Sequence, residues 1–168
     1  DLSEQSNQPF ISGNSVIVYN GEIKNYKEIK EDLNDKNFFT NSDTEVLLSL
    51  WQNYKLDGLR KIDGMFAFAI YENKEIYIGT DYFGEKPIYY LKNDQGFYFS
   101  SEPKVLIKLL NLNKSLTQSE FAEFLSLGFI ISPGTGFEKL KVLEQNSLIK
   151  IDQNNKIEVS KIFHINEI

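Results

Sequence analysis

The chain has 168 residues, a formal net charge of -6 and no cysteine. Its hydrophobic content of 41% and aromatic content of 14% are those of a folded globular protein rather than of a disordered one. This length fits one domain, and two very small domains also fit. The negative charge argues against a nucleic-acid partner, because phosphate binding needs a clustered cationic face.

The sequence does not predict a membrane-spanning segment, a disulfide bond or a metal site. No apolar stretch reaches the roughly 20 residues that a membrane-spanning helix requires, so we expect no membrane partner. The absence of cysteine excludes disulfides and thiolate ligands within the sequence, and no cluster of other ligand types predicts a metal site. A cysteine-free composition is compatible with the reducing cytoplasm, which is the location that we expect.

The first predicted elements are a strand and a short helix. The β-branched and aromatic run Ser15–Tyr19 predicts a strand, and Asn20 with Gly21 predicts a turn at its end. A short amphipathic helix follows, with Asn25 as its N-cap and Glu28 at the third helical position.

A second helix is predicted to begin at Ser42, because apolar residues follow at helical spacing. Ser42 and Glu45 have the spacing of a capping box, in which each side chain satisfies a free backbone N–H of the first turn. Its apolar stripe consists of Val46, Leu47, Leu50, Trp51 and Tyr54.

Three hairpins and two more helices are predicted in the rest of the chain. Turn-forming residues at 72–74, 93–96 and 153–155 each separate two β-type runs. Helices are expected at 104–110 and 118–127, the second beginning with a capping box of Thr117 and Glu120.

The order of these elements predicts an α+β fold. Strands cluster in the middle, with helices between and after them, which does not fit a doubly wound parallel sheet. The uninterrupted apolar run 65–70 (MFAFAI) predicts a strand that is covered on both faces. Two stacked, mainly antiparallel sheets with helices outside would satisfy that requirement.

Five short blocks carry the functional signal. They are NGEIKNY (20–26), SDTE (42–45), DGMFAFAIY (63–71), DYFGEKPIYY (81–90) and SEPK (101–104). Together, in this order, they resemble the glutaminase half of the glutamine-hydrolysing asparagine synthetases, a class II glutamine amidotransferase. The resemblance covers nearly all of residues 1–168 and implies a four-layer αββα Ntn-hydrolase sandwich with two mainly antiparallel sheets.

The resemblance also implies a set of site residues for L-glutamine. Amide hydrolysis passes through a tetrahedral oxyanion, which fixed donors stabilise. The resemblance assigns this oxyanion hole to the Asn20 side chain and the Gly21 N–H, and it assigns substrate binding to Glu22. It pairs Asp43 with the α-ammonium of glutamine, a contact that a capping box does not explain. The ordinary alternative is that Asn-Gly is only a common turn dipeptide.

The two remaining polar blocks are interpreted as architectural. Gly84 and Pro87 are expected in a turn, across which Asp81 and Lys86 could form an ion pair. Ser101 and the glutamate after it are expected to begin and cap a helix.

Two positions and one segment depart from the pattern of the resembled family. Lys24 and Thr80 stand where the family usually has tyrosine and arginine, and residues 142–147 replace a proline-glycine turn. These differences leave room for a specialised paralogue.

The resemblance implies a nucleophile that these residues do not include. In that family an N-terminal cysteine attacks the amide, its α-amine carries the proton, and a thioester is then hydrolysed. We therefore expect an N-terminally truncated, inactive fragment of a polypeptide that begins Met-Cys-Gly. We expect that polypeptide to continue past Ile168 into a synthetase domain, which uses ATP and Mg²⁺ to convert aspartate to asparagine. No cofactor is expected in the glutaminase domain itself.

Two other functions remain open from the sequence. One is a nucleophile-less structural domain of a related amide or β-lactam synthetase. The other is an amidotransferase of surface-polysaccharide biosynthesis. A homodimer is an open possibility for the assembly.

Overall fold

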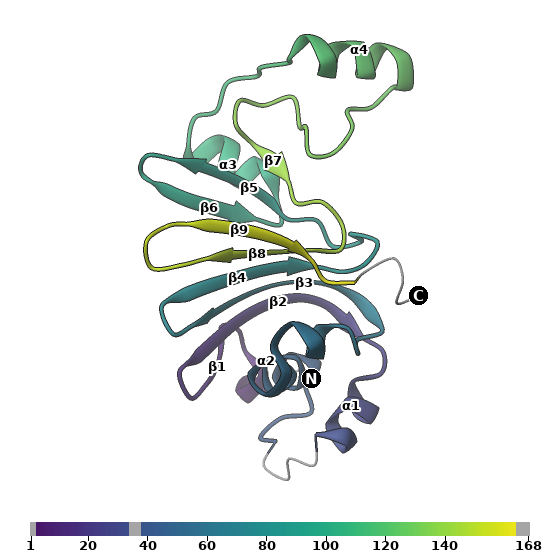
Figure 1. Ribbon diagram of the computed structural model, residues 1–168, viewed down its shortest axis with the longest axis vertical. Helices are drawn as coiled ribbons and strands as arrows, with labels where there is room; N and C mark the ends of the chain where they lie inside the picture. Colours follow the sequence, from purple (N-terminus) through teal and green to yellow (C-terminus); the bar gives the residue numbers. More distant parts are fainter. Residues whose placement is uncertain (1–2, 34–37, 164–168) are drawn as a thin grey trace. The chain divides into compact units, whose positions relative to one another are not determined.

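Six strands form an antiparallel sheet in the computed structural model, which describes residues 3–33 and 38–163. The order of its strands is β1-β2-β3-β4-β8-β9 (Figure 1). The bounds are β1 Phe10–Ser12, β2 Ser15–Ile23, β3 Gly64–Glu72, β4 Glu75–Thr80, β8 Ser147–Ile151 and β9 Ile157–Lys161, and a short 3₁₀ helix, η1 (Glu4–Ser6), precedes β1. This sheet belongs to one of two compact units, residues 1–86 with 145–168, while residues 87–144 form the other.

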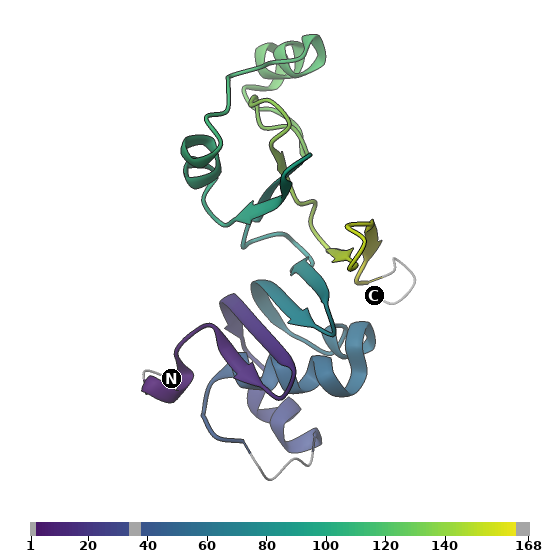
Figure 2. The same cartoon turned by 90° about the vertical axis from the view of Figure 1, so that its left-hand side faces the viewer.

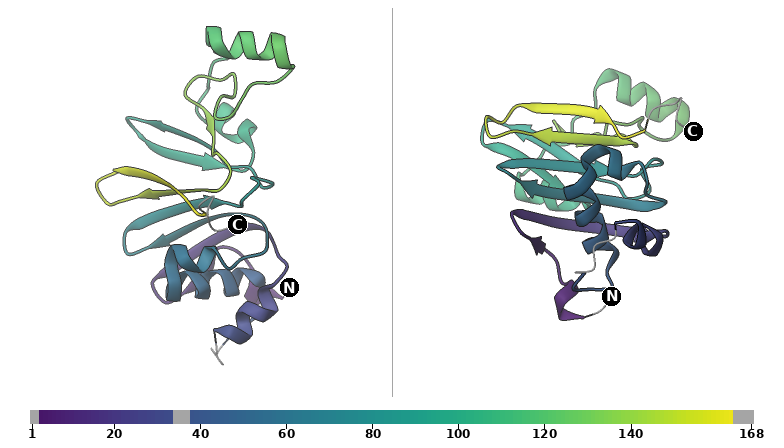
Figure 3. Two further views of the ribbon diagram at one scale, coloured as in Figure 1. Left: turned by 45° about the vertical axis from the view of Figure 1, so that its right-hand side comes forward. Right: turned by 60° about the horizontal axis from the view of Figure 1, so that its bottom comes forward.

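Two helices, α1 (Tyr26–Asp32) and α2 (Asp43–Leu59), accompany this sheet (Figures 2 and 3). Trp51 of α2 is buried, and its ring centroid lies 6.4 Å from that of Phe68 and 4.6 Å from that of Tyr77. Burying such aromatic rings supplies a large share of the hydrophobic free energy that holds a helix on a sheet. The predicted apolar stripe of this helix is confirmed, except that Tyr54 at its far end is 44% exposed.

Strand β3 is buried on both of its faces, as its apolar run predicts. The five consecutive residues Phe66–Ile70 are all buried, although successive side chains of a strand point to opposite faces. The three predicted hairpins are also confirmed: β3 pairs with β4, β5 with β6, and β8 with β9. Asn73 and Lys74 in the first turn have φ values of 52° and 64°, the left-handed region that two-residue hairpin turns require.

Residues 87–144 form a three-stranded antiparallel sheet in the order β6-β5-β7, together with two helices (Figure 1). The elements are β5 Tyr89–Asn93, β6 Gly96–Ser100, α3 Pro103–Leu109, α4 Gln118–Leu127 and β7 Lys141–Val142. The capping box at α4 is confirmed, because Glu120 N–H donates to Thr117 Oγ1 and Thr117 N–H donates to Glu120 Oε2. The helices and the two antiparallel sheets confirm the predicted α+β class.

The predicted turn at Asn20 and Gly21 is wrong. Strand β2 continues through both residues to Ile23, and they pair with Ala67 and Phe66 of β3. The Asn-Gly dipeptide favours a turn only when the chain has no better partner. Here the ladder with β3 supplies that partner over nine residues, and tertiary pairing prevails over the local preference.

Candidate functional site

Four predicted site residues lie on β2 and at the start of α2. Asn20, Gly21 and Glu22 are consecutive on β2, and Asp43 is the first residue of α2. Two hydrogen bonds join the elements: Tyr19 Oη donates to Asp43 Oδ2 at 2.8 Å, and Ile23 N–H donates to the same oxygen at 3.1 Å. The structure therefore brings Asp43, which is distant in sequence, against the residues on either side of the Asn-Gly-Glu motif.

The backbone N–H of Gly21 points away from β3 and toward a free strand edge. Lys24 N–H donates to Asp63 O at 2.8 Å on the β3 side, and N–H directions alternate along an antiparallel strand. The N–H groups of Tyr19, Gly21 and Ile23 therefore point to the other side. Strand β1 pairs only with residues 15–17 there.

The two N–H groups beside that of Gly21 already have acceptors. Tyr19 N–H donates to Gln8 Oε1, and Ile23 N–H donates to Asp43 Oδ2. Within the described residues no side chain or loop accepts from the Gly21 N–H. This donor is available to a ligand oxygen, and it is held in place by a strand that pairs along its whole length.

Gly21 is also required by the close approach of β2 and β3. A Cβ at this position would lie 2.2 Å from Met65 O and 2.7 Å from Phe66 Cα, both backbone atoms that cannot move aside cheaply. Gly64 shows the same crowding against Glu22 O, at 2.3 Å. Any side chain at residue 21 would push the two strands apart and displace the N–H donor.

The side chains of Asn20 and Glu22 are exposed and share the face of β2 opposite to Tyr19 and Ile23. Neither side chain forms a hydrogen bond or an ion pair within the described residues. A strand interior offers no structural reason for an exposed asparagine amide, since asparagine is depleted in strands. Both side chains are therefore free to contact a ligand.

The Tyr19 hydroxyl lies in a negatively charged environment. Burial, followed by the charge of Asp43 and the hydrogen bond to it, raises the pKa of Tyr19 well above the ordinary tyrosine range. The charge of Glu22 acts in the same direction. Tyr19 therefore remains a neutral hydrogen-bond donor throughout the pH range in which enzymes work. Sequence reasoning missed it, although its period-2 spacing from Gly21 and Ile23 was a usable signal.

The segment before α2 corrects the predicted capping box. Ser42 is the N-cap, since Thr44 N–H donates to Ser42 Oγ at 3.2 Å. Glu45, however, does not reach back to Ser42. Its carboxylate accepts from Phe39 N–H at 2.9 Å and from Thr40 N–H and Oγ1 at 2.7 and 2.6 Å. The donors of the loop before the helix occupy this carboxylate. The expected capping box is therefore reduced to a cap by Ser42 alone, and the buried Glu45 holds residues 39–40 in place.

The expected cap by Asn25 is also corrected. Asn25 occupies the N-cap position of α1, but its side chain makes no capping hydrogen bond. Its amide donates to Lys61 O at 2.9 Å, and its oxygen accepts from Asp63 N–H at 3.0 Å. This asparagine therefore connects the end of β2 to the segment that leads into β3.

The expected ion pair between Asp81 and Lys86 is absent from the described structure. The buried Asp81 carboxylate instead accepts four backbone N–H groups, from Phe66 at 3.1 Å, Phe83 at 3.0 Å, Glu85 at 3.1 Å and Lys86 at 3.3 Å. The expected turn is confirmed, with Gly84 at a φ of 68°. This segment is architectural, but through backbone hydrogen bonds rather than through a charge pair.

Ser101 and Glu102 do not cap the helix that follows them. Glu102 holds the N-cap position of α3 without a capping hydrogen bond, and Pro103 is the first helical residue. A proline there removes one of the free N–H groups that a cap would otherwise satisfy. No site role is assigned to these two residues.

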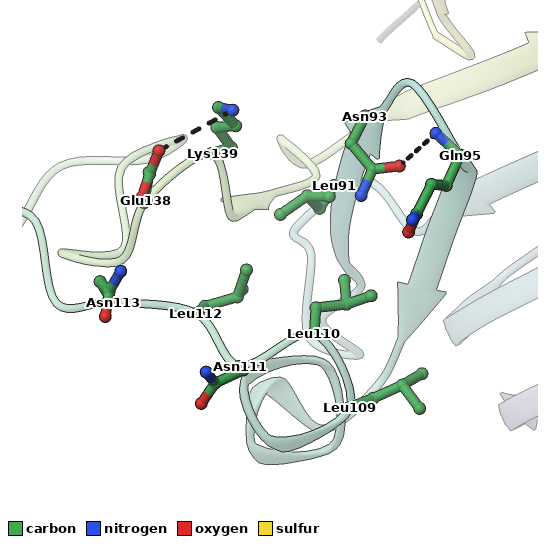
Figure 4. Close-up of a pocket in the computed structure, with 10 residues that line it drawn as sticks. All are labelled: Leu91, Asn93, Gln95, Leu109, Leu110, Asn111, Leu112, Asn113, Glu138 and Lys139. Atoms are coloured by element: carbon green, nitrogen blue, oxygen red, sulfur yellow. Dashed lines mark hydrogen bonds and ion pairs between the residues drawn. The ribbon is translucent and has the colours of Figure 1, made fainter.

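A pocket of about 360 Å³ lies in the unit formed by residues 87–144 (Figure 4). Its polar lining includes Asn93, Asn111 and Asn113, together with Glu138 and Lys139, whose charged groups are 3.8 Å apart. The residues that line it include no serine, threonine, histidine or free carboxylate that could act as a nucleophile or a base. Within the described ranges no cluster of ligand side chains could hold a metal ion.

A scan of protein families matches residues 1–162 to the glutamine amidotransferase domain. The chain belongs to this family. It is 36% identical over 154 residues to asparagine synthetase [glutamine-hydrolyzing] 1 of Bacillus subtilis, a match that covers 89% of this chain. It is also 36% identical over 155 residues to a putative asparagine synthetase [glutamine-hydrolyzing] 2 of Methanocaldococcus jannaschii. These matches span only 24% and 29% of the two relatives.

Solved structures support the fold of this amidotransferase domain. The glutamine phosphoribosylpyrophosphate amidotransferase of B. subtilis superposes with a TM-score of 0.65 over 97% of this chain and 33% of its own. The sequence identity is 19%, so this likeness concerns the fold alone. The fold of the chain, with its helices and two antiparallel sheets, is therefore similar to the fold of this amidotransferase. No helix in the part of the chain that the structure describes is long and apolar enough to cross a bilayer.

Proposed function

We propose that this amidotransferase domain forms the glutaminase site of a glutamine-hydrolysing asparagine synthetase. The observation that carries the proposal is the free Gly21 N–H at the edge of β2, beside the exposed Asn20 amide. Two neutral donors on a rigid strand are suited to an oxygen that gains negative charge during the reaction. The names of the relatives suggest that the substrate is glutamine, because both are described as glutamine-hydrolyzing.

The substrate would be recognised by the acidic side chains that flank these donors. Asp43 Oδ2 already accepts two hydrogen bonds, but its Oδ1 accepts none within the described residues. That oxygen would accept the α-ammonium of glutamine, and the exposed Glu22 carboxylate would reinforce it. A charge-assisted contact of this kind discriminates glutamine from simple amides.

The chemical step needs a nucleophile that the 168 residues do not contain, because they include no cysteine. We propose that an N-terminal cysteine, as in the resembled family, attacks the amide carbon to give a tetrahedral oxyanion held by Asn20 and Gly21. The α-amine of that cysteine would take the thiol proton and pass it to the leaving nitrogen as the oxyanion collapses, which releases ammonia and leaves a thioester. Water then hydrolyses the thioester to glutamate. The 168 residues alone would be inactive.

The ammonia would be used by an ATP-dependent synthetase domain linked to this one. The relatives are three to four times longer than their matched part and are named for asparagine synthesis, which motivates this step. ATP and Mg²⁺ would bind in that domain, and the glutaminase site would need no cofactor. We propose that the enzyme works in the cytoplasm.

The test is a glutaminase assay on the polypeptide as its own gene encodes it, with Asn20→Ala as the decisive variant. Removing one oxyanion donor should lower kcat for glutamine by roughly 10²–10³ with little change in KM. Asn53→Ala is the matched control, because the side chain of this exposed asparagine on α2 bonds, among the described residues, only to Ser49 O of its own helix.

Three outcomes would decide the proposal. Release of glutamate, with the loss confined to Asn20→Ala, supports it. A natural polypeptide without glutaminase activity would favour the structural-domain alternative. If Asn20→Ala reduced ammonia-driven synthesis as much as glutamine-driven synthesis, the role of Asn20 would be structural and the oxyanion assignment would be wrong.

A further inference from the structure

The two oxygens of the Asp43 carboxylate have different surroundings. Oδ2 accepts from Tyr19 Oη at 2.8 Å and from Ile23 N–H at 3.1 Å. Oδ1 accepts no hydrogen bond within the described residues. Two donors on one oxygen fix both the position and the rotation of the carboxylate, so the free oxygen has a defined direction.

Tyr19 is well placed to hold this carboxylate. Its ring is half-buried and packs against the core cluster that includes Ile17 and Phe68, so its hydroxyl has little freedom to move. It is also two residues from Gly21 on the same strand. A shift of the Tyr19 hydroxyl would therefore change the distance between Asp43 and the oxyanion donor.

We propose that Tyr19 is a positioning residue that sets the specificity of the site for substrates with an α-ammonium group. Its hydroxyl holds Asp43 so that Oδ1 meets the ammonium while the side-chain amide of the substrate reaches the Gly21 N–H. This inference rests on the proposed glutaminase function. It assigns to Tyr19 a role that acts only through Asp43.

A purely structural role for the Tyr19 hydroxyl makes a different prediction. If the hydroxyl only stabilised the join between β2 and α2, its loss would affect all substrates equally. If it positions Asp43, its loss should matter only for a substrate that carries the α-ammonium. The two cases are separated by comparing L-glutamine with 4-carbamoylbutanoate, which is glutamine without its α-amino group.

The experiment compares Tyr19→Phe with Tyr77→Phe in the full natural polypeptide. Tyr77 is the matched control, because its hydroxyl also donates to a carboxylate, that of Glu75, on a different strand of the same sheet. Tyr19→Phe should raise KM for L-glutamine about tenfold, the usual size for a hydrogen bond to a charged group, and leave kcat nearly unchanged. KM for 4-carbamoylbutanoate should not change. Tyr77→Phe should change the KM for neither substrate.

A double-mutant cycle provides a second measurement. In an Asp43→Asn background, Tyr19→Phe should have no further effect on KM for L-glutamine, because the two side chains act as one unit. Equal losses with both substrates, or additive effects in the cycle, would overturn the role of Tyr19 while the glutaminase function stands. Failure of the unmodified polypeptide to hydrolyse L-glutamine would overturn the proposed function, and this inference with it.

Discussion

The start of α2 and the segment after β4 each contain an aspartate from a recognisable block, and the two are used differently. Asp81 accepts four backbone N–H groups, two on each oxygen, and it is 1% exposed. Asp43 accepts two donors on one oxygen, and its other oxygen accepts none within the described residues. Both carboxylates are held firmly, but only one retains unused acceptor capacity.

The difference lies in the hydrogen-bond acceptor capacity that each carboxylate leaves for a ligand. A buried carboxylate whose oxygens are all satisfied by the backbone has nothing left to offer a ligand. A carboxylate fixed through one oxygen is preorganised and still able to accept from a cation. Glu45 belongs with Asp81, since the loop before α2 supplies donors to both of its oxygens.

Replacing Asp81 with alanine should produce the largest effect. It would leave four backbone N–H groups without their acceptor, three of them in the segment between β4 and Pro87. Breaking a buried charged network of this kind costs about 3–5 kcal/mol. Hydrogen exchange of the β3 amides in the full polypeptide would measure the loss, with the exposed Asp57→Ala as control. A loss below about 1 kcal/mol would contradict the structural assignment.

Replacing Asp43 with asparagine should affect binding more than stability. The asparagine oxygen can still accept from Tyr19 and Ile23, but an NH₂ group then stands where an ammonium needs an acceptor. We expect KM for glutamine to rise about 10–100-fold and kcat to change little. Synthesis from free ammonia should be unaffected, because it bypasses the site. The measurement is paired kinetics with glutamine and with ammonium chloride as nitrogen source, and Asp57→Asn is the control. Equal losses in glutamine-driven and ammonia-driven synthesis would contradict the binding role of Asp43.

The sequence predicted the elements well because their signals are local. The capping box at Thr117 and the hairpin turn at 73–74 depend on contacts between near neighbours, and both are present. Strand β3 was predicted because burial on both faces leaves a continuous apolar run. In each case the residues that carry the signal are also the residues that make the contact.

The details that failed depend on partners outside the local sequence pattern that was used to predict them. The same capping-box spacing at Ser42 and Glu45 gave a different result, because Thr40 and Phe39 compete for the glutamate. Asn20 and Gly21 continue a strand because β3 pairs with them, and no local pattern contains that information. The resemblance supplied the site residues, and only the structure revealed the contact of Tyr19 with Asp43.

Replacing Lys86 with methionine should produce the smallest effect, and it tests the corrected contact directly. The sequence suggested that the Lys86 ammonium pairs with Asp81, but the structure uses the Lys86 backbone N–H instead, at 3.3 Å. Methionine keeps that N–H and a side chain of similar length while removing the charge. We therefore expect the free energy of unfolding to change by less than about 0.5 kcal/mol. A loss of 2 kcal/mol or more, on the order of breaking a hydrogen bond to a charged group, would show that Asp81 needs the ammonium. In that case its four backbone donors would not be sufficient, and the contrast with Asp43 would fail.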